Sequence, residues 1–115
     1  MQLFVLVLNR TEFLEPLFEA MLESGINGAT VLDSTGMMRV LSSDENADLP
    51  MLGLIRHIYS PERRASKTVF IVLKDEQVDT LVRLVDRVTG GLDQPDTGIA
   101  FAMPLTFVEG LDKRS

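Results

Sequence analysis

The sequence of 115 residues contains no cysteine and no tryptophan, and it has only one histidine and one tyrosine. Without cysteine there is no disulfide framework, thiolate metal site or cysteine nucleophile, and a single histidine argues against a histidine-rich metal site. No apolar run approaches the ~20 residues that a membrane-spanning helix needs. The first residues also lack the basic segment and the cleavage site of a secretory signal. We therefore expect a cytoplasmic protein without membrane insertion.

Positive charge is also scarce, because 11 Lys and Arg face 17 Asp and Glu and leave a formal charge of −6. This balance opposes nonspecific attraction to nucleic acids, so we expect no nucleic-acid partner. The chain is instead rich in apolar residues, which make up 45% of it and suffice for the core of one domain. Four of its basic residues lie close together in the sequence beside His57 and form one basic patch: Arg56, Arg63, Arg64 and Lys67.

A unit of apolar strand, amphipathic helix and second apolar strand occurs twice in the sequence. The copies cover residues 3–8, 12–24 and 26–32, and residues 69–73, 75–88 and 99–107. This doubled unit predicts an α+β, ferredoxin-like split βαβ fold (βαββαβ), with an antiparallel four-stranded sheet and two helices on one face. We expect a single domain over residues 1–111 with a long loop at 34–66, followed by a charged tail at 112–115.

Proline and glycine residues predict several boundaries. Pro16 fits the first helix only within its first turn, and Gly25 is expected to end that helix. The second helix is expected to end at Thr89–Gly91. Pro104 must lie at a sheet edge or a bulge, because proline cannot donate a ladder hydrogen bond. Inside the long loop, the pattern at residues 48–59 predicts a short helix that either packs on the domain or responds to a ligand.

Both units have strands that are apolar without alternation, although the predicted fold covers only one face of the sheet. Leu3–Leu8 and Val69–Leu73 should therefore present apolar side chains to the uncovered face. An exposed patch of that size exceeds what a soluble monomer normally tolerates, and its burial is worth about 25 cal/mol per Å². We predict that two or three copies pack their sheets together about an axis.

Residues 19–31 read Glu-Ala-Met-Leu-Glu-Ser-Gly-Ile-Asn-Gly-Ala-Thr-Val and precede Asp33 and Gly36. This stretch resembles the PII (nitrogen regulatory) signalling family, whose first helix ends in Gly-hydrophobic-x-Gly-x-Thr-Val and leads through a glycine into the long T-loop. Asp75–Thr80 and the Thr-Gly pair at residues 89–90 are similar to that family's second helix and to the start of its B-loop. The resemblance covers nearly the whole chain in order and spacing.

The resemblance implies a non-enzymatic regulatory protein that assembles as a homotrimer. Small effectors, typically adenine nucleotides, bind in the family between subunits, at the base of the T-loop and the B-loop. The 34–66 loop would then change conformation and act on a protein target. No cofactor is required for this function.

The lysines that hold nucleotide phosphates in the family are missing from this chain. The family's B-loop reads Thr-Gly-Lys-x-Gly-Asp-Gly-Lys, whereas this chain has Gly91 at the first lysine position and Thr97 and Gly98 near the end. Asp93 and Asp96 are added, and their carboxylates repel a triphosphate. We therefore expect that the usual ATP-binding mode is lost and that the effector is a different nucleotide or another anion.

The candidate ligand-binding residues lie in two glycine-containing segments and in the basic cluster. They are Thr35, Gly36, Met37, Met38, Thr89, Gly90, Gly91, Arg56, Arg63 and Arg64. Backbone N–H groups in the two segments remain for binding an anion, and the arginines can replace the missing lysines. The same arginines can instead be solvated partners of nearby acids, and the methionines can be adaptable ligand contacts or plain packing.

Two functions from other classes stay open. His57 has a pKa suited to acid–base work in a small ferredoxin-like α/β-barrel enzyme, although no residue at a suitable spacing orients it. Carboxylates such as Asp33, Asp93 and Asp96 can gather at a subunit cleft in a metal-tolerance trimer of the same fold. The sequence contains no catalytic constellation and no metal-ligand motif, so we name no catalytic or metal-binding residue.

Overall fold

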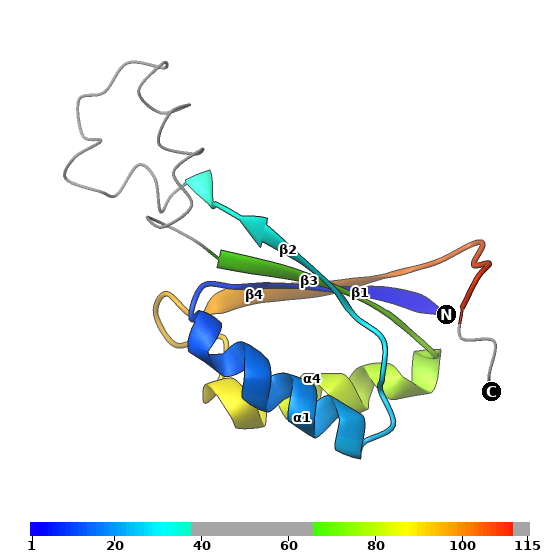
Figure 1. Cartoon of the computed structure of the whole chain (residues 1–115), viewed down its shortest axis with the longest axis horizontal. Helices are drawn as coiled ribbons and strands as arrows, with labels where there is room; N and C mark the ends of the chain where they lie inside the picture. The colour runs from blue at the N-terminus through cyan, green and yellow to red at the C-terminus, as the bar shows by residue number, and fades with distance from the viewer. Residues whose placement is uncertain (38–65, 112–115) are drawn as a thin grey trace.

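The structure, a computed structural model, describes residues 1–37 and 66–111. Its elements in chain order are β1 (Gln2–Leu8), η1 (Thr11–Phe13), α1 (Leu14–Glu23), β2 (Thr30–Ser34), β3 (Ser66–Leu73), η3 (Asp75–Gln77), α4 (Val78–Thr89) and β4 (Gly98–Pro104). The strands form one four-stranded sheet in which every pair is antiparallel. Figure 1 shows α1 and α4 on the same face of this sheet. The predicted α+β class is confirmed, and the arrangement is consistent with a ferredoxin-like fold.

The strand order is β2-β3-β1-β4. β3 lies between β1 and β2, the two strands that α1 connects, and β1 lies between β3 and β4, the two strands that α4 connects. This order makes β2 and β4 the two edge strands of the sheet that residues 1–37 and 66–111 form. Pro104, the last residue of β4, therefore lies at an edge, as the sequence predicted.

The structure corrects several predicted strand boundaries, since β3 begins at Ser66 instead of Val69 and β2 ends at Ser34 instead of Leu32. β2 begins at Thr30 instead of Ile26, because Ile26 packs into the core at 3% exposure and its N–H donates to the Met21 C=O at 2.8 Å. β4 ends at Pro104 instead of Phe107, and Phe107 is 75% exposed.

Helix boundaries follow local capping. Pro16 lies within the first turn of α1, and Gly25, with a φ of 81°, follows its end, both as predicted. Before α4, the Gln77 side-chain oxygen accepts the Lys74 N–H at 2.9 Å. Gly90 ends α4 in the left-handed conformation, with a φ of 83°.

The core lies between the sheet and the two helices. Alternate residues of β1 and β3 face the helices and are at most 2% exposed: Phe4, Leu6, Leu8, Val69, Ile71 and Leu73. The helices contribute a matching set of buried residues: Leu17, Ala20, Met21, Leu81, Leu84 and Val85.

The opposite face of the sheet is also apolar, and no element among residues 1–37 and 66–111 covers it. The register places Val5 between Phe70 and Phe101 on this face. The most exposed large side chains here are Leu32 at 47%, Ile99 at 58%, Phe101 at 45% and Met103 at 42%. We call this surface the open face. The prediction that the strands are apolar on both faces is confirmed.

Candidate functional site

The facing ends of β2 and β3 are joined by hydrogen bonds among the hydroxyl groups of Ser34, Ser66 and Thr68, which we call the hydroxyl network. The Thr68 hydroxyl donates to the Ser34 Oγ at 2.7 Å, and the Ser66 hydroxyl donates to the Ser34 C=O at 3.0 Å. The Ser34 and Ser66 hydroxyl oxygens are 2.9 Å apart, and because the Ser66 proton is already used, Ser34 is the donor in this contact. Ser66 is fully buried. These bonds hold the last residue pair of the β2–β3 ladder, Ser34 with Ser66.

An ion pair reinforces the same end of the sheet. The Lys67 ammonium contacts the Asp33 carboxylate on the strand beside it. The first candidate ligand residues follow directly. Thr35 is half-buried, Gly36 is exposed, and Met37 is 72% exposed. Met37 therefore offers its apolar side chain to solvent or to a binding partner and does not pack in the core.

The second candidate segment ends α4, and its polar groups are largely bonded within the chain. The buried Thr89 hydroxyl donates to the Val85 C=O at 2.7 Å and accepts the Gly91 N–H at 3.1 Å. The Gly90 N–H donates to the Asp86 C=O at 2.9 Å. The sequence suggested that these amides remain for an anion, but both already have acceptors in the chain. The segment would have to open before it could bind a ligand through them.

The strand ends nearest the two candidate segments lie at the same end of the sheet, since Thr35 follows β2 and the loop after Thr89–Gly91 leads into β4 at Gly98. Register pairs run from Asp33 to Lys67, from Lys67 to Leu8, and from Leu8 to Gly98, so one row of residues joins β2 to β4. Three strand spacings separate the edges, which is ~14 Å. The end of β2 and the start of β4 are therefore at opposite edges of the sheet.

The remaining candidate residues, Met38, Arg56, Arg63 and Arg64, lie outside the described residues, as do His57 and the predicted helix at 48–59. Within residues 1–37 and 66–111, no group of three or more acidic or histidine side chains is placed to hold a metal ion. Among these same residues no helix has the length and apolarity to cross a membrane.

Sequence reasoning missed the hydroxyl network. Serines at both ends of the predicted loop were the available signal, because Ser34 and Ser66 are the two residues that bound the segment. Serine and threonine are common in turns, so their type alone did not indicate that they bond one another across two strands.

One carboxylate near this end of the sheet has a perturbed pKa. The pKa of Glu12 lies below its ordinary value, chiefly because its own backbone N–H bonds the carboxylate and also because Arg10 donates to it. The Arg10–Glu12 pair is 3.0 Å long and exposed, and the Arg10 guanidinium stacks 5.5 Å from the Phe13 ring centre. This pair orders the exposed turn that leads into α1.

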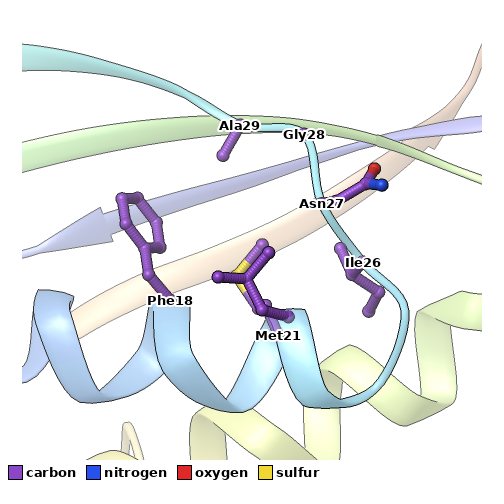
Figure 2. A pocket seen from close by; sticks show the side chains of 7 residues that line it. Phe18, Met21, Ile26, Asn27, Gly28 and Ala29 are labelled. Carbon is purple, nitrogen blue, oxygen red and sulfur yellow. The ribbon is translucent and has the colours of Figure 1, made fainter. Parts of the chain in front are cut away.

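Two hollows flank the connection from α1 to β2. One, of about 230 Å³, lies between α1 and this connection and is lined mostly by apolar groups: Phe18, Met21, Leu22, Ile26, Asn27, Gly28 and Ala29. Figure 2 shows Phe18 and Met21 projecting from α1 into this space, while the Asn27 side chain points away from Phe18. The other, of about 560 Å³, lies at the end of the sheet away from the long segment and includes Lys74 and Gln77 in its wall.

A third hollow, of about 290 Å³, lies between α4 and the edge strand β4. Its lining is almost wholly apolar: Phe4, Val78, Val82, Leu92, Ala100, Phe101 and Ala102. We call it the α4–β4 groove. The alanines of β4 are too small to fill the space beside α4, which leaves the groove open at the sheet edge.

Comparisons of the chain with protein-family models and with curated proteins yield no match.

Proposed function

We propose that this chain is a PII-like regulatory protein of the cytoplasm, without catalytic activity. In this proposal a small anionic effector binds in clefts between copies of the chain. Binding changes the 34–66 loop, which acts on a protein target. The fold is then the split βαβ arrangement of that family. The strand order supports this assignment, because each main helix connects two strands that are not neighbours in the sheet.

The observation that carries the proposal is that β2 and β4 are the opposite edges of the sheet. Residues 35–37 follow β2, and the loop after Thr89–Gly91 leads into β4, so a cleft at both strand ends would be completed by a second copy. The open face independently favours assembly, because Leu32, Ile99 and Phe101 expose 45% to 58% of their surface. We expect a homotrimer, as the resemblance implies.

The chemistry of the α4–β4 loop supports an effector other than ATP bound in the family's usual way. Asp93 and Asp96 are exposed there, and this loop has no lysine. The amides of Gly90 and Gly91 already have acceptors. An effector with less negative charge than a triphosphate suits this loop better, because fewer repulsive contacts with the two carboxylates arise.

The proposal is tested by measuring the mass of the assembled protein and its binding of small anionic compounds. Light scattering at micromolar concentration should give the mass of an oligomer, and calorimetry with ATP, ADP, AMP and citrate should show heat for at least one compound. Hydrogen exchange should then show protection within residues 34–66. A monomer, or no heat from any of the four with no change in exchange, would refute the proposal.

A matched pair of variants locates the site. Thr35→Ala should weaken binding of the compound found, because Thr35 belongs to the segment after β2. Thr106→Ala removes the same group beyond the opposite end of β4 and should leave binding unchanged. Equal affinity in both variants would remove Thr35 from the site.

A further inference from the structure

The connection from α1 to β2 contains the only Asn-Gly pair of the sequence, Asn27–Gly28. The other asparagines, Asn9 and Asn46, precede arginine and alanine. The backbone nitrogen of the residue after an asparagine can attack the carbon of the side-chain amide and close a succinimide ring. Glycine in the second position favours this attack, because it has no Cβ to obstruct the approach and restricts the backbone least.

The backbone around this pair is free of regular structure. α1 ends at Glu23 and β2 begins at Thr30, so neither residue of the pair belongs to a helix or a strand. Both are exposed, as is Ala29 after them. Within the described part of the chain the Gly28 N–H donates to no acceptor. No hydrogen bond therefore has to break before this nitrogen moves toward the side chain that precedes it.

The side chain that reacts has the same freedom. Figure 2 shows Asn27 pointing away from Phe18, and the described residues provide no hydrogen-bond partner for its amide. No atom lies within 4 Å of the place where a Cβ of Gly28 would be, so the space beside the attacking nitrogen is open. Both hollows that flank the connection include Asn27 and Gly28 in their walls, which gives water access from either side.

The two ends of the connection are anchored, which confines any change to its middle. Ile26 is buried, and its N–H donates to the Met21 C=O at 2.8 Å. Thr30 pairs with Phe70 in the sheet. Residues 27–29 lie between these anchors, so the sheet and the helices do not have to open for a reaction there.

We propose that Asn27 is a site of spontaneous deamidation in the folded protein, with water as the only co-reactant. Hydroxide removes the Gly28 N–H proton, and the nitrogen forms a bond to the side-chain carbonyl carbon of Asn27. The bond from that carbon to the amide nitrogen breaks, and ammonia leaves with a proton from water. Water then cleaves the ring. Cleavage at the side-chain carbon yields aspartate, and cleavage at the main-chain carbon yields isoaspartate.

Both products change the connection, whether or not the proposed function is correct. Each adds a negative charge to the wall of the hollow of about 560 Å³, where Lys74 has the only charged side chain among the described residues that line it. The new carboxylate is attracted to Lys74. Isoaspartate also routes the main chain through the former Asn27 side chain, which inserts an extra backbone atom between Ile26 and Thr30. A longer connection restrains its two anchors less, so isoaspartate is the more destabilising product.

Peptide mapping of protein incubated at physiological temperature tests the proposal. Trypsin places each asparagine in a separate peptide: 1–10, 11–39 and 40–56. The peptide with Asn27 should gain a single mass unit with time, and faster as pH rises, because hydroxide starts the reaction. Electron-transfer fragmentation then distinguishes isoaspartate from aspartate. The peptide with Asn9 should stay unchanged and serves as the control within the same digest.

Gly28→Ala is the matched control variant. The space around Gly28 accepts a Cβ and its φ lies outside the left-handed region, so the variant should fold as wild type does and lose most of the modification. Asn27→Gln should lose it as well, since the longer side chain closes a less favourable ring. Modification of Gly28→Ala at the wild-type rate would overturn the proposal.

A comparison of folded and unfolded protein separates the role of the structure from that of the dipeptide. At one pH, folded wild type should be modified about as fast as wild type in guanidinium chloride, because the folded connection leaves both reacting groups free. If the folded protein is protected and only the unfolded chain reacts, the proposed site does not exist in the native structure.

The variant Asn27→Asp tests the consequence for stability, since it adds the charge without the extra backbone atom. In urea denaturation it should unfold at a higher midpoint than aged wild type enriched in isoaspartate. Equal midpoints would overturn the argument that the lengthened connection weakens the fold.

Discussion

Replacement of Ile99 by serine tests whether the open face is buried in solution. Ile99 is 58% exposed in the single chain, which leaves about 110 Å² of apolar surface for a neighbour to cover. At ~25 cal/mol per Å² this burial contributes nearly 3 kcal/mol, of which serine retains a part. We expect Ile99→Ser to weaken association by ~2 kcal/mol per interface, which is about 30-fold in the dissociation constant.

The assay is sedimentation velocity over a dilution series from high to low micromolar concentration. Leu22→Ser is the matched control, because Leu22 is a large apolar side chain that is 64% exposed on α1, away from the open face. Circular dichroism checks that both variants are folded. If Ile99→Ser dissociates no more readily than Leu22→Ser, the open face is not an interface, and the burial argument is refuted.

Three further predictions concern the chain itself. Gly98→Ala should destabilise the fold by at least about 2 kcal/mol, because a Cβ there would lie 2.2 Å from a backbone oxygen, whereas Gly28→Ala should be near neutral because nothing lies within 4 Å. Ser66→Ala should cost ~1–3 kcal/mol in urea denaturation, since it removes a buried hydroxyl that both donates and accepts. The pKa of Glu12, followed by NMR, should lie below its ordinary value and rise only partly in Arg10→Gln, because its own backbone N–H is the larger cause.

The sign of the Glu12 effect follows from its lowered pKa. The ionised carboxylate favours the folded chain above the pKa of the unfolded state, and this contribution is lost as pH falls through the lower pKa of the folded state. A normal pKa in wild type would contradict the cause assigned here.

For the Ser66→Ala prediction, Ser24→Ala at an exposed position is the control. Equal stability of the two serine variants would show that the hydroxyl network of Ser34, Ser66 and Thr68 contributes nothing to stability.

Much of the fold could be predicted because its signals are local. Apolar runs at Leu3–Leu8 and Val69–Leu73 indicated two strands, and stripes at helical spacing indicated two helices, all of which the structure contains. Gly25 and Gly90 marked helix ends because each adopts a positive φ. The excess of apolar residues on both strand faces was visible in the sequence, since a strand buried on one side should alternate.

The errors arose where a tertiary contact decides the local structure. Ile26 was predicted to be the first residue of a strand, but its side chain is buried in the core. Three more residues follow it before β2 begins at Thr30. The bonded state of the Gly90 and Gly91 amides was equally hidden, because a Thr-Gly-Gly sequence does not reveal that the threonine hydroxyl accepts one of them. The placement of the ends of β2 and β4 at opposite edges depends on strand order, which arises from the pairing of distant strands and not from a local pattern.

The hydroxyl network of Ser34, Ser66 and Thr68 has a consequence for how this protein can change over time. It fixes the two points from which the long segment departs, independently of what lies between them. Doubling the length of a flexible connection costs only ~0.6 kcal/mol in closure entropy. Insertions, deletions and whole-segment replacements between these serines should therefore change the free energy of unfolding of the sheet very little. The fold can acquire new binding specificities there while its core sequence stays the same.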